Sequence, residues 1–257
     1  MSIHPSAIIH PKAELDSSVE VGPFSIIGEH VRIGSGTQVG PHVVIDGWTE
    51  IGEGSIVYSF ASIGQPPQDL KYKGEPSRLK IGRRNTFREF VTIHRGTEKG
   101  GGETVIGDGN FFMAYAHVAH DCHIGNEVVM ANAATLAGHI TIGDHAYIGG
   151  LVGVHQFVKI GAHVMIGGCS AVAQDVPPYV CVAGNRAKLY GLNQIGLERR
   201  GFSREQIEGL KGAYKLLFRS GLTLREAAKQ AREKWKKIAD VESLVSFVEQ
   251  SERGVCR

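Results

Sequence analysis

An apolar residue returns at every sixth position through most of the first two thirds of this chain. The first run consists of Ile3, Ile9, Leu15, Val21, Ile27, Ile33, Val39, Ile45, Ile51, Val57 and Ile63, and the second of Ile106, Phe112, Val118, Ile124, Met130, Leu136, Ile142, Ile148, Val154, Ile160, Ile166 and Val172. A fixed short repeat indicates a solenoid. Neither a heptad nor a helical face has a period of six, so we expect coils of β-strands.

Two segments interrupt the repeat. Residues 65–80 (QPPQDLKYKGEPSRLK) are polar and contain proline, and the repeat resumes at Ile81. Residues 94–104 (HRGTEKGGGET) are rich in glycine and shift the register by one residue. Insertions in a solenoid leave one edge of the coils as loops, often on the binding face. The alternative is that both are surface loops without a function, which a solenoid tolerates.

The repeat ends at Asp175, and the spacing then becomes helical. We expect four helices: residues 188–200, a helix opened by a Ser203–Gln206 capping box that continues through Tyr214 and Phe218, a helix opened by a Thr223–Glu226 box that runs toward Ile238, and residues 241–251. We therefore predict a β-helix domain over residues 1–185 and a helical domain over residues 186–257 that covers the last coil.

Charge differs between these two parts. Residues 186–257 hold 16 Lys and Arg against nine Asp and Glu, a net charge of +7, whereas residues 1–185 carry −5. A basic tail on an acidic body suggests an anionic partner, although helical tails are also often basic for solubility.

The cysteine spacing and the hydropathy indicate in which cellular compartment the protein is expected. Cys122, Cys169, Cys181 and Cys256 show no CxxC spacing, which favours a reduced, cytoplasmic protein. No apolar run reaches the roughly 18 residues that span a bilayer, and the start of the chain does not resemble a signal peptide. We expect no stable membrane insertion.

The segment AHVAHDCHIG, residues 116–125, is the strongest candidate for chemistry. Val118 points inward, so His120 lies two residues beyond it. The equivalent positions one and two coils further on are Gly138 and Gln156, and stacked strands lie about 4.8 Å apart. A histidine at a corner suits a general base, Asp121 can orient it, and the bare N–H of Gly138 can stabilise an oxyanion. A structural surface histidine is the alternative.

Other chemistries remain open from the residues alone. Cys122 offers a nucleophile, but its position favours a buried structural thiol. A zinc site assembled across a subunit interface is a further reading, although no HxxxH or HExxH spacing occurs; its ligands would come from His94, His117, His123, His139, His145 and His155. The glycines belong to the repeat, and no GxGxxG unit or Walker loop argues for a nucleotide cofactor.

Several longer segments resemble one family closely. ASIGQPPQDLKYKGEPSRLKIG, VTIHRGT, AHVAHDCHIGN, ATLAGHITIGD, VHQFVKIGAHVMIGGCSAVAQDVPPYV and RRGFSRE are similar to the UDP-N-acetylglucosamine O-acyltransferases over essentially the whole chain. The resemblance implies a left-handed parallel β-helix of triangular coils, an all-β fold with a C-terminal helical domain, and a homotrimer with sites between subunits.

The resemblance also implies an activity and its partners. The enzyme would transfer a 3-hydroxyacyl chain from acyl carrier protein to the 3-hydroxyl of UDP-N-acetylglucosamine, the first step of lipid A biosynthesis. It would use no cofactor and no metal, and neither nucleic acid nor a membrane would be a partner. The acidic carrier protein is the anionic partner that the basic tail would attract.

Carried over residue by residue, the family's site falls on the following positions. The catalytic group is His120, Asp121 and Gly138; the substrate contacts are Asp69, Lys71, His117, His139, His155, Gln156, Asn193, Arg199 and Arg200; and the acyl-chain ruler is Gly168. This chain differs from some members of the family at one position, where they have a glutamate and it has Ile195. A ribose or uracil contact from that carboxylate would be missing here.

Three competing readings stay open. A related solenoid acyltransferase that acts on a glucosamine nitrogen carries an additional N-terminal domain, whereas the hexads here begin at Ile3. A solenoid carbonic anhydrase would bind zinc, so metal content separates it from an acyltransferase. A non-catalytic scaffold would not need the His120–Asp121 pair, the glycine-rich loop and the basic tail together.

Overall fold

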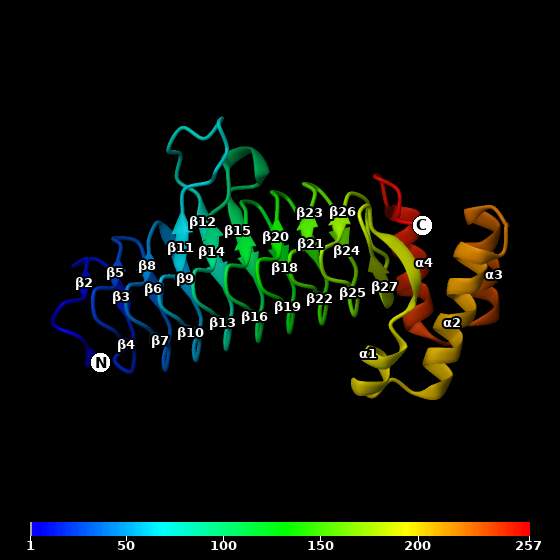
Figure 1. Ribbon diagram of the computed structural model, residues 1–257, viewed down its shortest axis with the longest axis horizontal. Helices are drawn as coiled ribbons and strands as arrows, with labels where there is room; N and C mark the ends of the chain where they lie inside the picture. Colours follow the sequence, from blue (N-terminus) through cyan, green and yellow to red (C-terminus); the bar gives the residue numbers. More distant parts are fainter. Residues whose placement is uncertain (1) are drawn as a thin grey trace.

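The computed structural model describes residues 2–257 and shows a triangular prism of stacked coils with helices at one end (Figure 1). Each coil contributes one short strand to each of three parallel sheets. Successive coils are in register, as in the pairs Val118–Leu136 and Leu136–Val154. The hexad residues point inward and are buried over most of the prism, so the predicted solenoid is confirmed.

The first sheet, sheet A, is closed at its C-terminal end by an antiparallel pair. Its strands are β1 (Ser2–Ile3), β4 (Glu20–Val21), β7 (Gln38–Val39), β10 (Ile56–Val57), β13 (Thr86–Phe87), β16 (Phe111–Phe112), β19 (Val129–Met130), β22 (Tyr147–Ile148), β25 (Met165–Ile166), β27 (Val180–Ala183) and β28 (Lys188–Leu192).

The other two sheets are purely parallel. Sheet B consists of β2 (Ile8–Ile9), β5 (Ile26–Ile27), β8 (Val44–Ile45), β11 (Ser62–Gln65), β14 (Thr92–His94), β17 (His117–Val118), β20 (Thr135–Leu136), β23 (Gly153–Val154) and β26 (Ala171–Val172). Sheet C consists of β3 (Glu14–Leu15), β6 (Arg32–Ile33), β9 (Trp48–Ile51), β12 (Arg78–Ile81), β15 (Glu103–Ile106), β18 (His123–Ile124), β21 (Thr141–Ile142) and β24 (Lys159–Ile160).

The three edges of the prism give a simple frame for the site. We call the turns from sheet A to sheet B corner 1, those from B to C corner 2, and those from C to A corner 3. The two insertions join β11 to β12 and β14 to β15, so both leave corner 2. The second contains a short 3₁₀ helix, η1 (Glu98–Gly100). Figure 1 shows the two loops side by side above the coils.

The C-terminal helices are α1 (Gln194–Arg199), α2 (Arg204–Arg219), α3 (Leu224–Lys234) and α4 (Ala239–Gln250). Both predicted capping boxes are formed, one by Ser203 with Gln206 and one by Thr223 with Glu226. The helices bury their apolar faces against one another and against Tyr179 at the end of the prism. Within residues 2–257 no helix is both long enough and apolar enough to cross a membrane.

Two helix predictions were wrong in extent. Residues 188–192 are not helical but form β28, because the free edge of β27 needs a hydrogen-bonding partner and Gly191 takes a positive φ of 155°. The third helix ends at Lys234 rather than Ile238. Trp235 and Ile238 instead pack onto α2, where Gly209 and Gly212 leave space for them. The boundary between residues 185 and 186 stays a prediction, since β27 and β28 join the two parts.

Candidate functional site

His120, Gly138 and Gln156 follow β17, β20 and β23 at corner 2, which forms the predicted column. The imidazole of His120 lies directly over Gly138, because a Cβ added to that glycine would be 2.6 Å from Cε1 and 2.9 Å from Nε2 of the ring. Within residues 2–257 the Gly138 N–H donates to no other group. A histidine side chain and an unused backbone donor therefore lie side by side, as a base and an oxyanion donor require.

Asp121 forms a hydrogen bond with the edge of the His120 ring, at Nδ1. Its Oδ2 lies 2.7 Å from His120 Nδ1, and its side chain is fully buried whereas that of His120 is partly exposed. Burial alone would raise the pKa of Asp121, but hydrogen bonds from His120 and Thr97 outweigh it and hold that pKa below its ordinary value. Asp121 is thus a fixed anion that leaves Nε2 as the free nitrogen of His120.

A groove of about 680 Å³ runs along the outer face of sheet B beside His120. Its walls include Gln68 from the first insertion, His117, His155 and Arg186. Its floor is formed by outward residues that become small along the sheet, namely Thr135, Gly153 and Ala171. The groove therefore lies directly beside the column of polar groups at corner 2.

Histidines surround this groove in different environments. His117 bonds Thr92 at 2.7 Å through Nδ1 and packs edge-on against His94. Burial lowers the pKa of His94 to about 4 and also lowers that of His117. Burial likewise lowers the pKa of His139, which stacks on Phe157. These rings are therefore uncharged at neutral pH.

The predicted contact residues fall into two sets. Asp69 and Lys71 lie in the first insertion, and His117, His139, His155 and Gln156 lie on the coils, so all six lie at or beside corner 2. Arg200 is instead at corner 3, where Nη1 lies 3.1 Å from Glu127 and 2.6 Å from His145.

The remaining predicted residues also lie away from corner 2. Asn193 caps α1 and donates from Nδ2 to the carbonyl oxygen of His163 at corner 3. Arg199 is exposed in the last turn of α1. Gly168 is at corner 1, where an added Cβ would be 3.2 Å from the Gly150 carbonyl oxygen. A single chain therefore does not bring the full predicted set together.

Cys122 is fully buried, and its Sγ donates to the carbonyl oxygen of Ala137 at 3.2 Å. Burial raises the pKa of this thiol to about 12, so it is not a thiolate at neutral pH. The interpretation of Cys122 as a structural thiol is supported.

The possible metal ligands were only partly anticipated. The set that lies close together is His120, Asp121 and His139, whose ligand atoms are all within 4.8 Å of one another. Both Asp121 oxygens already accept hydrogen bonds, from Thr97 and from His120. The cluster is therefore arranged as a hydrogen-bonded pair with a neighbouring ring.

Sequence reasoning missed three features of the site. Thr97 and its bonds to Asp121 come from a loop whose path has no sequence signal. Arg186 ends the groove after the irregular segment that follows β27. Arg253, in the C-terminal tail, brings Nη2 to 3.3 Å from His155 Nδ1. For the groove itself the sequence did hold a signal. The residues directly before the inward positions point outward on sheet B, and those of the later coils, Gly153 and Ala171, are small.

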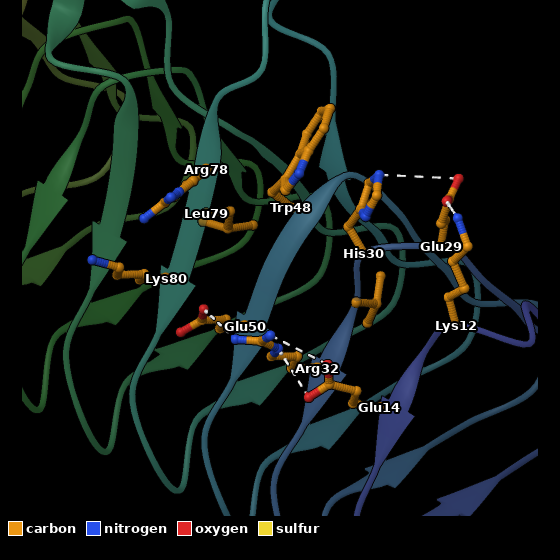
Figure 2. A pocket seen from close by; sticks show the side chains of 11 residues that line it. Lys12, Glu14, Glu29, His30, Arg32, Trp48, Glu50, Arg78, Leu79 and Lys80 are labelled. Carbon is orange, nitrogen blue, oxygen red and sulfur yellow. Dashed lines mark hydrogen bonds and ion pairs between the residues drawn. The ribbon is translucent and has the colours of Figure 1, made fainter.

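A separate hollow lies on sheet C in the N-terminal half (Figure 2). Trp48 stacks on His30 there with ring centroids 4.6 Å apart. Its charged groups pair across neighbouring strands, with Arg32 3.1 Å from Glu14 and 3.7 Å from Glu50. It contains none of the predicted site residues, and such exposed pairs each add little stability.

Comparisons with known proteins agree with this geometry. A family profile described as "Udp N-acetylglucosamine O-acyltransferase; Domain 2" matches residues 175–256, and a bacterial transferase hexapeptide profile matches residues 30–65 and 103–138. Proteins named acyl-[acyl-carrier-protein]–UDP-N-acetylglucosamine O-acyltransferase are 56% identical in Paraburkholderia phymatum and 57% identical in Thermodesulfovibrio yellowstonii. Each alignment covers 99% of both chains.

Solved structures show the same likeness. The UDP-N-acetylglucosamine O-acyltransferase of Moraxella catarrhalis is 44% identical over 100% of both chains, with a TM-score of 0.97. The LpxA of Acinetobacter baumannii is 46% identical over 99% of both chains, with a TM-score of 0.96. The fold is the left-handed parallel β-helix with C-terminal helices, and the chain belongs to the UDP-N-acetylglucosamine O-acyltransferase family.

Proposed function

We propose that this protein transfers a 3-hydroxyacyl chain from acyl carrier protein to the 3-hydroxyl of UDP-N-acetylglucosamine, the first step of lipid A biosynthesis. Relatives that share more than half of their residues with this chain over its whole length are named acyl-[acyl-carrier-protein]–UDP-N-acetylglucosamine O-acyltransferase. The observation that carries the proposal is the close packing of the His120 ring, held by Asp121, against Gly138, whose N–H is unused, beside a groove.

The geometry supports direct transfer. Nε2 of His120 removes the proton from the sugar hydroxyl, and the sugar oxygen attacks the thioester carbonyl carbon. The Gly138 N–H stabilises the oxyanion that forms. The carbon–sulfur bond then breaks, and the pantetheine sulfur leaves with the proton that His120 carries. Asp121 stabilises the imidazolium between these two proton transfers, so the sequence needs no acyl-enzyme.

We propose that no metal or other cofactor takes part. The Asp121 carboxylate already accepts three hydrogen bonds, two from Thr97 and one from His120, and a cation would have to compete with them. Metal analysis of the purified protein provides the test that separates this reading from the zinc lyase, because a zinc enzyme would hold one ion per subunit.

A homotrimer completes the site in this proposal. Asn193 and Arg200 are at corner 3, whereas His120 is at corner 2 of the same prism. Three prisms around an axis, each with corner 1 inward, place corner 2 of one beside corner 3 of the next. Arg199 and Arg200 would then face the diphosphate bound near the neighbour's His120, where guanidinium groups pair well with phosphate oxygens.

Corner 1 has the surface that such an axis needs. Its aromatic rings stack along the prism with centroid separations of 4.8 to 5.1 Å, in the order Phe24, His42, Phe60, Phe90 and Tyr115. Phe24 and Tyr115 are each 60% exposed in the single chain. A continuous exposed apolar ladder of this kind marks a protein contact, and a three-fold axis along corner 1 buries it.

The charge of the helical part supports acyl carrier protein as the partner. The basic helical part, with a net charge of +7, favours the acidic carrier protein through long-range attraction.

Gly168 leaves open the space that a bulky residue would fill, so we propose it as the position that limits acyl-chain length. Ile195 is 65% exposed and supplies no carboxylate to the nucleotide. The four free cysteines favour a cytoplasmic location.

The test offers the purified protein UDP-N-acetylglucosamine together with a panel of 3-hydroxyacyl carrier proteins of different chain lengths. We expect a product whose mass equals the nucleotide sugar plus one 3-hydroxyacyl group, and whose ester is at the sugar 3-hydroxyl. Absence of product with every donor, or an amide product, would contradict the proposal.

A further inference from the structure

The second insertion returns to the coil of His120 and closes over Asp121. Thr97 donates its backbone N–H to Oδ1 of Asp121 at 2.7 Å and its hydroxyl to Oδ2 at 2.7 Å. Thr97 is 4% exposed and Asp121 is 2% exposed. Hydrogen bonds to a charged group in a buried place are among the stronger ones in proteins, so this threonine fixes both oxygens of the carboxylate.

The loop around Thr97 is built to hold it there. The same hydroxyl accepts a hydrogen bond from the Gly100 N–H at 3.1 Å and so caps η1. Gly100 packs its α-carbon against the Asp121 carboxylate, where a side chain would clash. On the other side, Thr104 accepts the Asp121 N–H at 2.8 Å. The second insertion therefore holds the Asp121 carboxylate in place.

The carboxylate has two histidines within reach. Oδ2 lies 2.7 Å from His120 Nδ1 and 3.7 Å from His139 Nε2. The two rings meet edge to face, with centroids 5.1 Å apart. A carboxylate free to turn would divide its hydrogen bonding between them, and the Thr97 hydroxyl holds Oδ2 in the position that serves His120.

We propose that Thr97 is a positioning residue for acyl transfer, which locks Asp121 onto His120 Nδ1 and so keeps Nε2 facing Gly138. This inference rests on the proposed function, because it requires His120 to be the base. Thr97 acts only through Asp121. Its loss should therefore alter the rate and the pH dependence of transfer much more than the binding of either substrate.

The experiment compares Thr97→Val, Thr97→Ser and a matched control, Thr37→Val. Thr37 is also buried, and its hydroxyl bonds the Gly52 carbonyl oxygen in the N-terminal coils, far along the chain from His120. The rate of product formation is measured from pH 5 to pH 9 with each substrate varied in turn. Thr97→Val removes the hydroxyl, whereas Thr97→Ser keeps it.

We expect kcat of Thr97→Val to fall about tenfold, the size of one hydrogen bond to a charged group, with the KM for UDP-N-acetylglucosamine changed less than about twofold. The profile of kcat/KM against pH should also differ from that of Thr37→Val, because Asp121 is held less firmly against His120. Thr97→Ser and Thr37→Val should match the unmodified protein. Thr97→Ala should reproduce the effect if Thr97→Val does not fold.

Two results would overturn the inference while leaving the proposed function intact. One is a pH profile and kcat for Thr97→Val equal to those of Thr37→Val. The other is a Thr97→Ser variant as impaired as Thr97→Val, which would mean that the shape of the loop matters and the hydroxyl does not. Failure of the proposed function itself is distinguished by a different outcome, the absence of product from the unmodified protein with every 3-hydroxyacyl donor.

Discussion

The imidazole of His120 lies in the space where a side chain on Gly138 would be, with an added Cβ only 2.6 Å from Cε1. The two residues belong to successive coils and follow the paired inward residues Val118 and Leu136. The absence of a side chain in one coil thus creates room for the His120 ring of the coil before it and leaves the Gly138 N–H without an acceptor among the described residues.

A Gly138→Ala substitution tests this packing. The methyl group displaces the His120 ring, and a displacement of about 1 Å at a catalytic group costs roughly 100-fold in rate. We expect kcat to fall by that order while the oligomer and its thermal unfolding temperature are retained. Steady-state kinetics with calorimetry checks this, and a rate close to that of the unmodified protein would show that the two residues need not be in contact.

Cys122 separates direct transfer from a covalent mechanism. Its buried thiol has its pKa raised to about 12, so it offers no nucleophile at neutral pH. We expect Cys122→Ser and Cys122→Ala to keep kcat within about threefold, because any loss would come only from packing. Rapid-quench mass spectrometry should find no acylated protein. An inactive but folded Cys122→Ala, or acyl-protein in the quench, would favour an acyl-enzyme.

Mixed oligomers test whether each site uses two subunits. His120→Ala and Arg200→Ala proteins are each expected to have low activity. When equal amounts are unfolded and reassembled together, about one quarter of the sites in random trimers combine an intact His120 with an intact Arg200 of the neighbour. Activity should therefore return to about that fraction. A mixture no more active than its separate components would place both residues in a site within one chain.

Buried His94 makes stability depend on pH. Its pKa is lowered to about 4 by burial, whereas that of an unfolded histidine is about 6.5. Between these values the unfolded chain binds a proton that the native state does not, so the free energy of unfolding falls as pH decreases through this window. At pH 5 the loss from His94 is about 2 kcal/mol.

Unfolding by urea at pH 7.5 and pH 5 measures this loss. A His94→Gln variant carries no titrating group at this position and should lose less stability than the unmodified protein over the same interval. An equal loss in both proteins would show that His94 does not contribute to the pH dependence.

The repeat predicted the core and the column of His120, Gly138 and Gln156, because each inward residue fixes the position of its neighbours on the coil. His120 and Gly138 could be related in this way by counting alone. Thr97 could not, since the path of the insertion that brings it to Asp121 follows from loop contacts and has no period. The same holds for Lys188–Leu192, where the hydrogen-bonding needs of the β27 edge overrode a helical pattern.

The position of Arg200 could not be predicted from the sequence, for a different reason. Its role was carried over from the family, but no feature of the sequence places it at corner 3 beside Glu127. The helical domain reaches back along the prism by tertiary packing, which the order of residues does not reveal. Only the structure separates the predicted site into the part at corner 2 and the part at corner 3.

The turnover number of a His120→Ala variant at saturating substrates tests most directly whether His120 is the general base. Loss of a general base costs about 10²–10⁴ in rate, and the buried hexads that hold the coils together are untouched by the change. We predict a folded oligomer of normal size whose kcat is lower by a factor in that range. A folded variant that keeps more than about a tenth of the normal turnover would show that a group other than His120 removes the proton.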